Sequence, residues 1–270
     1  MFIQNRHLRS GKENEDTMVP IISETTLSNS FDYPSIAKMI DHSLLNPSLN
    51  AFELEDGCSL ALRYNVASVC ILPYALERCA EILVGSTVNA STTIGFPHGG
   101  HTTAIKLAEA DQALQDGGQE LDVVINISKA RSGDWRYIHD ELAALTETTH
   151  AGGAKIKVIF ENAYLDDIAK IRLCQICGEI GVDWVKTSTG FASSGATLPD
   201  LELMRKYSPS SVQVKAAGGI RDLDALLAVR AIGVSRVGAT RTEAMLEECR
   251  KRLGLEPIAP VAMQTSPAGD

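Results

Sequence analysis

Three ionisable side chains lie within apolar runs that are typical of buried strands. Asp122 lies in ELDVVINI, Lys186 in VDWVKTST and Lys215 in VQVKAAGG. Side chains alternate along a strand, so each of the three points either into a core or toward a covering layer, and both places are largely dry. A charge in such a place is costly unless it is paired. These residues are therefore the first candidates for chemistry.

A buried Lys–Asp ion pair that only stabilises the core is one interpretation of this pattern. It accounts for Asp122 and one of the two lysines. It does not account for the second lysine, because one carboxylate facing two ammonium groups leaves a net positive charge without structural benefit. The surplus lysine favours a functional interpretation.

A second buried lysine is useful in reactions in which a lysine amine acts as a nucleophile. An unperturbed lysine has a pKa of about 10.4 and is almost entirely protonated near neutral pH. Burial and a neighbouring cation both lower the pKa of a lysine, and a neutral amine attacks carbonyl groups. Two lysines on adjacent strands with a carboxylate nearby therefore indicate Schiff-base chemistry, in which one amine is the nucleophile and the other groups move protons.

Eight apolar runs, each followed by a segment compatible with a helix, are the elements that must position these residues. The runs span residues 38–45, 66–72, 89–96, 120–127, 155–161, 182–189, 212–219 and 234–240. Strict alternation of strand and helix predicts parallel strands joined by right-handed crossovers. Eight units favour a single (β/α)8 TIM barrel, an α/β fold. An open doubly wound sheet is the second choice, but no glycine-rich dinucleotide turn follows the first run.

Composition limits the partners. The chain has 270 residues, 44% of them hydrophobic, with a formal net charge of −9. We expect no nucleic-acid or membrane surface, because that charge repels phosphate backbones and anionic lipid and no run is long enough to cross a bilayer. Six scattered cysteines and the lack of a secretory signal predict a cytoplasmic protein.

The predicted domains are a polar extension over 1–34, the barrel over 35–254 and a tail over 255–270.

Glycine-rich loops follow the last two runs, in AAGGIRD and VGATRTEA. In many barrels these two loops hold a phosphate on backbone N–H groups and at the N-terminus of a short helix. Gly218 and Gly219 allow a close approach of the backbone to a ligand. Glycines are most often plain turn residues, but two such loops after these strands favour a phosphate site.

Eight short segments occur along about residues 36–253, and they are IDHSLL, SVCILP, TIGFPHG, ELDVVINI, KVIFE, DWVKTSTGF, VKAAGGIR and RVGAT. In their order, and at close to their spacing, these segments resemble the 2-deoxyribose-5-phosphate aldolases, a family of class I aldolases. The resemblance implies a TIM barrel that reversibly cleaves 2-deoxy-D-ribose 5-phosphate to D-glyceraldehyde 3-phosphate and acetaldehyde. It implies no metal or organic cofactor, and it suggests a homodimer.

The resemblance also implies roles for individual residues. Lys186 would form the Schiff base, Lys215 would lower the pKa of that amine and join the proton relay, and Asp122 would be the acid/base partner. Asp41 would contact a substrate hydroxyl. The remaining substrate-binding candidates lie near the phosphate or between the two regions, and they are Thr189, Gly218, Gly219, Gly238, Ala239, Thr240 and Arg241.

Two features depart from the family's commoner pattern. The loop after the last strand reads GATRTEA where many members have Gly-x-Ser-Ser, so Arg241 either contacts the phosphate directly or points to solvent. Some members end in a tyrosine that reaches the site. Here the last tyrosine is Tyr207, so no contribution from the tail is expected.

Other reactive residues have simpler interpretations. Cys174 and Cys177 form a CxxC inside a helical pattern and are expected to be buried thiols rather than a redox pair. His42, His98 and His101 match no zinc-binding spacing, and Cys70 is expected in the pocket or core.

Three other functions stay open at this point. They are another Schiff-base phospho-sugar aldolase of the same barrel family, a lyase that uses a divalent metal, and a non-catalytic barrel that binds phospho-sugars.

Overall fold

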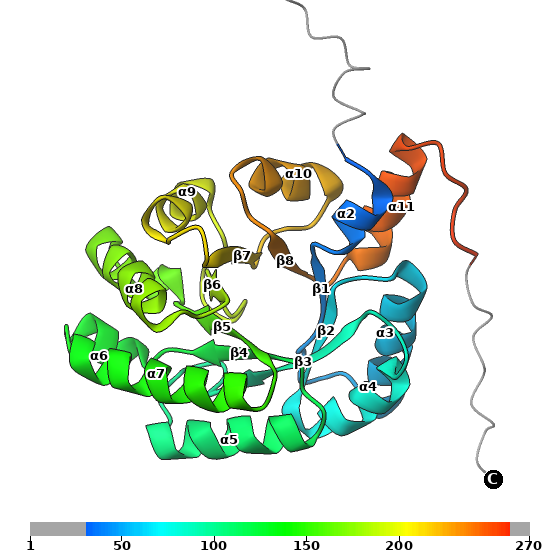
Figure 1. Ribbon diagram of the computed structural model, residues 1–270. Helices are drawn as coiled ribbons and strands as arrows, with labels where there is room; N and C mark the ends of the chain where they lie inside the picture. Colours follow the sequence, from blue (N-terminus) through cyan, green and yellow to red (C-terminus); the bar gives the residue numbers. More distant parts are fainter. Residues whose placement is uncertain (1–30, 260–270) are drawn as a thin grey trace, which may run out of the picture. The chain divides into compact units, whose positions relative to one another are not determined.

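The computed structural model of the protein describes residues 31–259, and Figure 1 shows the arrangement of their helices and strands. Eight parallel strands, in sequence order, form a closed barrel. The strands are β1 Ile40–Leu44, β2 Ser68–Ile71, β3 Asn89–Ile94, β4 Glu120–Val124, β5 Lys155–Ile159, β6 Trp184–Lys186, β7 Gln213–Ala217 and β8 Arg236–Ala239. Because β8 also pairs with β1, the sheet has no free edge. The predicted TIM barrel is confirmed.

Helices surround the barrel on its outer side (Figure 1). They are α2 Tyr33–Ala37, α3 Ala51–Tyr64, η1 Pro73–Ala75, α4 Leu76–Leu83, α5 Thr103–Gln115, α6 Ile127–Arg131, α7 Trp135–Ala151, η2 Asn162–Tyr164, α8 Asp167–Ile180, α9 Leu198–Tyr207, α10 Leu223–Ala231 and α11 Thr242–Arg252. Local sequence explains their ends. The Asp166 side chain accepts a hydrogen bond from the Ala169 amide at the start of α8, and Gly181, with a φ of 83°, ends that helix.

Each predicted run contains a strand, but every strand is shorter than its run. β6 ends at Lys186, although the Thr187 amide still donates to the Lys215 carbonyl at 3.2 Å. The Thr187 hydroxyl donates to the Ala217 carbonyl and accepts from the Ala217 amide, so a side chain takes over part of the ladder. The run over 120–127 ends early as well, because α6 begins at Ile127 with the Asn126 side chain as its cap. The predicted runs are longer than the strands because residues just beyond the strand ends are also buried, in the loops at the rim of the barrel. An apolar sequence pattern does not distinguish these loop residues from strand residues.

The strand register orders the inward-facing side chains into layers along the barrel axis. Because the strands of such a barrel are tilted, each layer takes its side chains from alternate strands. The lower layer is Ser68, Glu120, Trp184 and Arg236; the middle layer is Asp41, Ser91, Lys157 and Lys215; the upper layer is Cys70, Asp122, Lys186 and Gly238. Bulky branched residues usually fill these layers. Here polar and charged side chains fill most of them.

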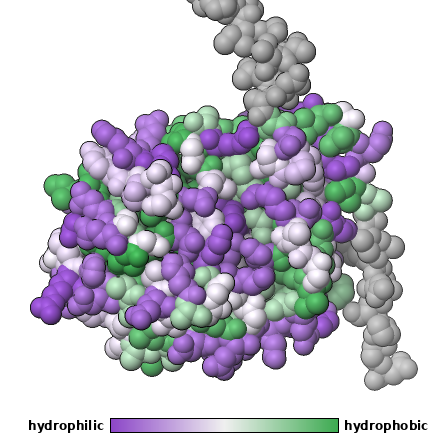
Figure 2. All heavy atoms as spheres, viewed as in Figure 1, coloured by the Kyte–Doolittle hydropathy of each residue, from purple (hydrophilic) through white to green (hydrophobic). Residues whose placement is uncertain are grey.

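The predicted extension and tail fall mostly outside the described part of the chain, because residues 1–30 and 260–270 are not described. α2 begins at Tyr33, and α11 ends at Arg252. Among residues 31–259 no helix has both the length and the apolar character that a membrane span needs. Figure 2 shows that hydrophilic residues are widespread on the face viewed and that hydrophobic residues are scattered among them.

Candidate active site

Asp122, Lys186 and Lys215 meet at the centre of the barrel. One carboxylate oxygen of Asp122, Oδ2, lies 2.7 Å from the Nζ of Lys186 and 2.7 Å from the Nζ of Lys215. All three side chains are almost completely buried, and Lys186 and Lys215 are paired positions on β6 and β7. The three residues selected from the sequence therefore form one cluster.

The two lysines differ in their pKa values. Burial lowers the pKa of Lys186, and the neighbouring Lys215 ammonium lowers it further, while Asp122 opposes both effects only in part. Burial would also lower the pKa of Lys215, but the Asp122 and Asp41 carboxylates outweigh it and raise that pKa. Lys186 is thus the better amine nucleophile, and Lys215 is the group that stays protonated.

Three more charged residues of the same apolar runs lie in the barrel, and sequence reasoning missed them. Lys157 of β5 donates to the other oxygen of Asp122 at 2.8 Å and lies 2.6 Å from a carboxylate oxygen of Glu120. Arg236 of β8 lies 3.0 Å from Glu120 and stacks over the Trp184 ring, 4.9 Å from its centroid. A count of every charge in the runs would have found all three.

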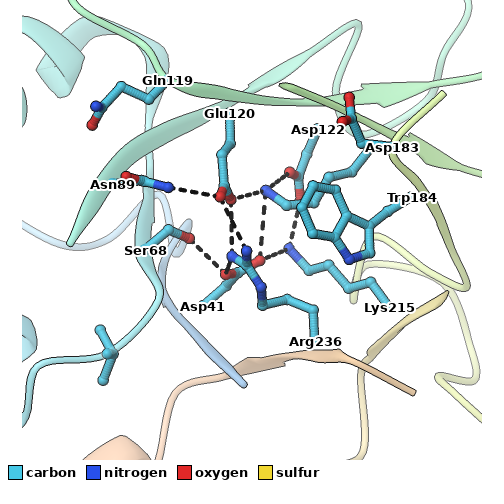
Figure 3. Close-up of polar contacts among 12 residues, drawn as sticks. Asp41, Ser68, Asn89, Gln119, Glu120, Asp122, Asp183, Trp184, Lys215 and Arg236 are labelled. Carbon is cyan, nitrogen blue, oxygen red and sulfur yellow. Dashed lines mark hydrogen bonds and ion pairs between the residues drawn. The ribbon is translucent and has the colours of Figure 1, made fainter. Parts of the chain in front are cut away.

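Asp41 contacts Lys215 of its own layer and Ser68 and Arg236 of the lower layer, as Figure 3 shows. Its Oδ2 lies 2.6 Å from Lys215 Nζ, and its Oδ1 accepts from Ser68 at 2.6 Å and from Arg236 at 2.5 Å. Burial would raise the pKa of Asp41, but Arg236 and Lys215 hold it well below its usual range. Asp41 is therefore an ionised partner of Lys215.

A cavity of about 350 Å³ opens above this cluster, at the carboxyl ends of the strands. Its volume is in the range of small-molecule sites. Lys186, Lys215 and Cys70 lie in its wall, so the expectation for Cys70 is confirmed. Of the predicted substrate-binding residues, the wall contains Asp41, Thr189, Gly218, Gly219, Gly238 and Thr240. The lysine cluster is thus accessible from the side where TIM barrels carry their sites.

Two of the predicted phosphate residues do not line this cavity. Ala239 is buried behind the wall, and Arg241 is exposed at the start of α11. The wall instead includes Arg221, which follows the two glycines after β7 and was not selected from the sequence. The sequence AAGGIRD already contained this signal, since an arginine close to a glycine pair is placed to bind an anion.

Glycines shape the wall next to Arg221. Gly218 and Gly219 have φ values of 77° and 92°, which other residues rarely adopt. The loop after β6 packs against them without room for a side chain, because a Cβ on Gly195 would lie 2.3 Å from the carbonyl oxygen of Gly218. The amide of Ala196 donates to that same oxygen at 2.9 Å. The two loops therefore hold each other in place.

Glu161 holds the other side of the wall. It follows β5 with a φ of 57°, an uncommon value for a residue with a side chain. Its buried carboxylate accepts hydrogen bonds from the amide and the hydroxyl of Thr189, and that hydroxyl in turn accepts from the Phe191 amide at 3.0 Å. Thr189 and Phe191 both line the cavity, so Glu161 fixes this part of the wall. It was also missed from the sequence.

The remaining candidates have structural surroundings. His42 Nδ1 lies 2.8 Å from the hydroxyl of Thr242, and burial lowers its pKa to about 4. His98 and His101 are exposed in the loop before α5. No group of three His, Cys, Asp or Glu that could hold a metal occurs within residues 31–259. Cys174 and Cys177 are buried thiols of α8, as expected.

Comparison with known proteins identifies the family of the chain. The family described as DeoC/LacD family aldolase matches residues 35–240. The deoxyribose-phosphate aldolase of Rhodopirellula baltica is 61% identical over 236 residues, which cover 87% of this chain and 98% of that protein.

Solved structures show the same relationship. A putative deoxyribose-phosphate aldolase from Coccidioides immitis superposes with a TM-score of 0.78 at 32% identity, covering 81% of this chain and 87% of that one. The deoxyribose phosphate aldolase from Aeropyrum pernix, described as a unique tetramer, gives a TM-score of 0.74 at 26% identity, covering 80% and 92%. On this basis the chain belongs to the DeoC/LacD family of aldolases.

Proposed function

We propose that this protein is a class I aldolase that reversibly cleaves 2-deoxy-D-ribose 5-phosphate to D-glyceraldehyde 3-phosphate and acetaldehyde. The observation that carries the proposal is the contact of Lys186 and Lys215 with one oxygen of Asp122, at the floor of the cavity. The 61% identical relative from Rhodopirellula baltica bears the name of that activity.

Lys186 is the proposed nucleophile. Its lowered pKa favours the neutral amine, which adds to the C1 aldehyde of the open-chain sugar phosphate. The resulting carbinolamine loses water and becomes a protonated imine. Asp122 lies within hydrogen-bond distance of the amine and is the proposed group that accepts and returns protons in these steps, with Lys215 as its cationic partner.

Cleavage of the C2–C3 bond then uses the imine as an electron sink. A base removes the proton of the C3 hydroxyl, the bond electrons move into an enamine on Lys186, and D-glyceraldehyde 3-phosphate leaves. The enamine takes a proton at carbon, and hydrolysis of the imine releases acetaldehyde and the free amine. Asp41 is the proposed contact of a substrate hydroxyl, since it lines the cavity beside Lys215. No step requires a metal or an organic cofactor.

The phosphate is proposed to bind at the glycine loops after β7 and β8. Gly218, Gly219, Gly238 and Thr240 lie in the cavity wall, and backbone N–H groups near helix N-termini attract anions. Arg221 lies in the same wall and supplies a cation for the phosphate. Thr189 closes the site between the lysine and the phosphate loops, held there by Glu161. Ala239, the last residue of β8, and Arg241, in the loop that follows it, lie outside the cavity lining.

An assay of cleavage tests the proposal. The intact protein is expected to release acetaldehyde from deoxyribose 5-phosphate without added metal and in the presence of a chelator. Lys186→Met keeps the length of the side chain but has no amine, and it should show no turnover while still folding. Turnover that depends on a divalent metal would point to a metal-dependent lyase, and binding of the sugar phosphate without turnover would point to a binding protein.

Two further features belong to this proposal. A homodimer is expected from the family resemblance, and the Aeropyrum pernix relative is described as a tetramer, so association of copies has a precedent. Sedimentation analysis gives the state directly. A cytoplasmic location is supported by the six cysteines, all of which lie in the described part and are buried free thiols.

A further inference from the structure

We propose that Glu120 and Arg236 of the lower layer, together with Lys157, tune the protonation of Lys186 by fixing the balance of charge along the barrel axis. These residues are tuning residues rather than catalytic ones, because none of them lines the cavity. The inference rests on the proposed Schiff-base role of Lys186.

The charged groups of the three layers do not balance. The carboxylates are Asp41, Glu120 and Asp122, and the cations are Lys157, Lys186, Lys215 and Arg236. With every group ionised, these layers carry one more cation than carboxylate. Deprotonation of one lysine removes the excess, and Lys186 has the weakest hold on its proton because it contacts only Asp122 among the three carboxylates.

Two chains of contacts lead from the lower layer to Lys186. In the first, Glu120 contacts Lys157 at 2.6 Å, and Lys157 contacts the Oδ1 of Asp122 at 2.8 Å. The opposite oxygen of Asp122 holds Lys186. A change at Glu120 therefore changes the share of the Asp122 charge that is available to Lys186.

The second chain runs from Arg236 through Asp41. Arg236 contacts Asp41 at 2.5 Å, and the other oxygen of Asp41 lies 2.6 Å from Lys215. Lys215 is the cation whose charge lowers the pKa of Lys186. The two series of contacts are joined at the lower layer, because Arg236 also donates hydrogen bonds to Glu120 at 3.0 Å and 3.1 Å.

The titratable groups that act most strongly on Lys186 are Asp122 of β4, Lys215 of β7 and the Cys70 thiol of β2. Burial raises the pKa of that thiol, so it adds no charge beside the lysine. On β3 the inward positions are Asn89, Ser91 and Thr93, and none of these side chains carries a charge.

The electrostatic consequence has a definite sign. Glu120→Gln removes one negative charge and keeps the shape of the side chain, so the excess of cations grows and Lys186 gives up its proton more readily. Lys157 keeps its own proton in this variant, because Asp122 and Asp41 also raise its pKa against the effect of burial. A unit charge at roughly 10 Å shifts a pKa by about one unit at an effective dielectric constant of about 20.

The pH profile of kcat/KM tests the proposal, since its acid limb reports the loss of the neutral amine in the free enzyme. We expect the limb to move down by about one pH unit in Glu120→Gln and up by a similar amount in Arg236→Gln. The double variant restores the charge balance and should return the limb to the parent position. Arg236→Lys keeps the charge and is the matched control, with an unmoved limb.

Opposite shifts of the acid limb in the two single variants support the proposal. If only one variant folds, it is sufficient for the test, because each variant has its own predicted direction of shift. A purely structural role of the lower layer predicts lower thermal stability and a lower plateau with the limb unmoved, which overturns the proposal. Borohydride trapping on Lys186 separates this result from a failure of the proposed function. An unmoved limb with normal trapping rejects only the tuning, whereas absence of trapping in the parent rejects both.

Discussion

Lys186 and Lys215 are paired positions on β6 and β7, and both ammonium groups lie 2.7 Å from the same oxygen of Asp122. Two cations that share one carboxylate oxygen in a dry barrel raise each other's cost of ionisation. The pair separates into an amine with a lowered pKa and an ammonium with a raised one. This asymmetry is what a Schiff-base enzyme needs from two identical side chains.

Removal of Lys215 should shift the activity of Lys186 toward higher pH. The Lys215 charge lowers the pKa of Lys186, so in Lys215→Met that pKa rises and the neutral amine becomes rarer near neutral pH. We expect kcat/KM near neutral pH to fall by about 100-fold and to recover partly as the pH is raised. A pH profile measures this. A loss of the same size at every pH would show that Lys215 acts only in proton transfer.

Removal of the Asp122 charge should damage both stability and catalysis. Asp122→Asn leaves Lys157, Lys186 and Lys215 without their shared carboxylate, and breaking a buried ion pair by removing one partner costs about 3–5 kcal/mol. Urea denaturation should show this loss. The activity of the folded fraction should fall at least about 100-fold, since proton transfer loses its acid/base group. Wild-type stability in this variant would mean that the cluster is largely uncharged.

Arg221 should matter for the phosphate and not for the aldehyde chemistry. Arg221→Gln is expected to raise KM for deoxyribose 5-phosphate by about tenfold, because a charge-assisted contact is lost, and to leave cleavage of unphosphorylated deoxyribose unchanged. Arg241→Gln is the matched control, since Arg241 does not line the cavity. An effect confined to Arg241 would assign the phosphate contact to the loop after β8.

His42 should make the protein less stable in mild acid. Its pKa is about 4 in the folded protein because burial disfavours the charged ring, whereas in the unfolded chain it is near the ordinary histidine value of about 6.5. The unfolded state therefore binds the proton first. Stability is complete above about pH 6.5 and decreases by roughly 2–3 kcal/mol as the pH falls toward about 4. Denaturation curves of the parent and of His42→Asn measure the difference, and equal slopes with pH would contradict this account.

Periodicity was sufficient to predict the barrel and the central cluster. All eight runs contain a strand, because parallel strands covered on both sides need continuous apolar sequence. Asp122, Lys186 and Lys215 were found because a charge within such a run is unusual. Their convergence followed from the closed topology.

Depth within the barrel could not be predicted. Lys155 and Lys157 are two residues apart on β5 and therefore face the same side, yet Lys155 is exposed and Lys157 is completely buried. Parity gives the side of a strand residue, but its layer depends on the register with neighbouring strands, which is set by long-range pairing. The same limit applies to the loops. Sequence reasoning selected Arg241, whereas the course of the chain brings Arg221 to the cavity.

Borohydride reduction in the presence of acetaldehyde or deoxyribose 5-phosphate, followed by peptide mass mapping, tests the central claim most directly. A two-carbon adduct on Lys186, formed without metal and absent from Lys186→Met, is the predicted result. An adduct on Lys215 or Lys157 instead would show that the assignment of Lys186 as the nucleophile is wrong. No adduct on any lysine of a folded, active sample would contradict the Schiff-base mechanism altogether.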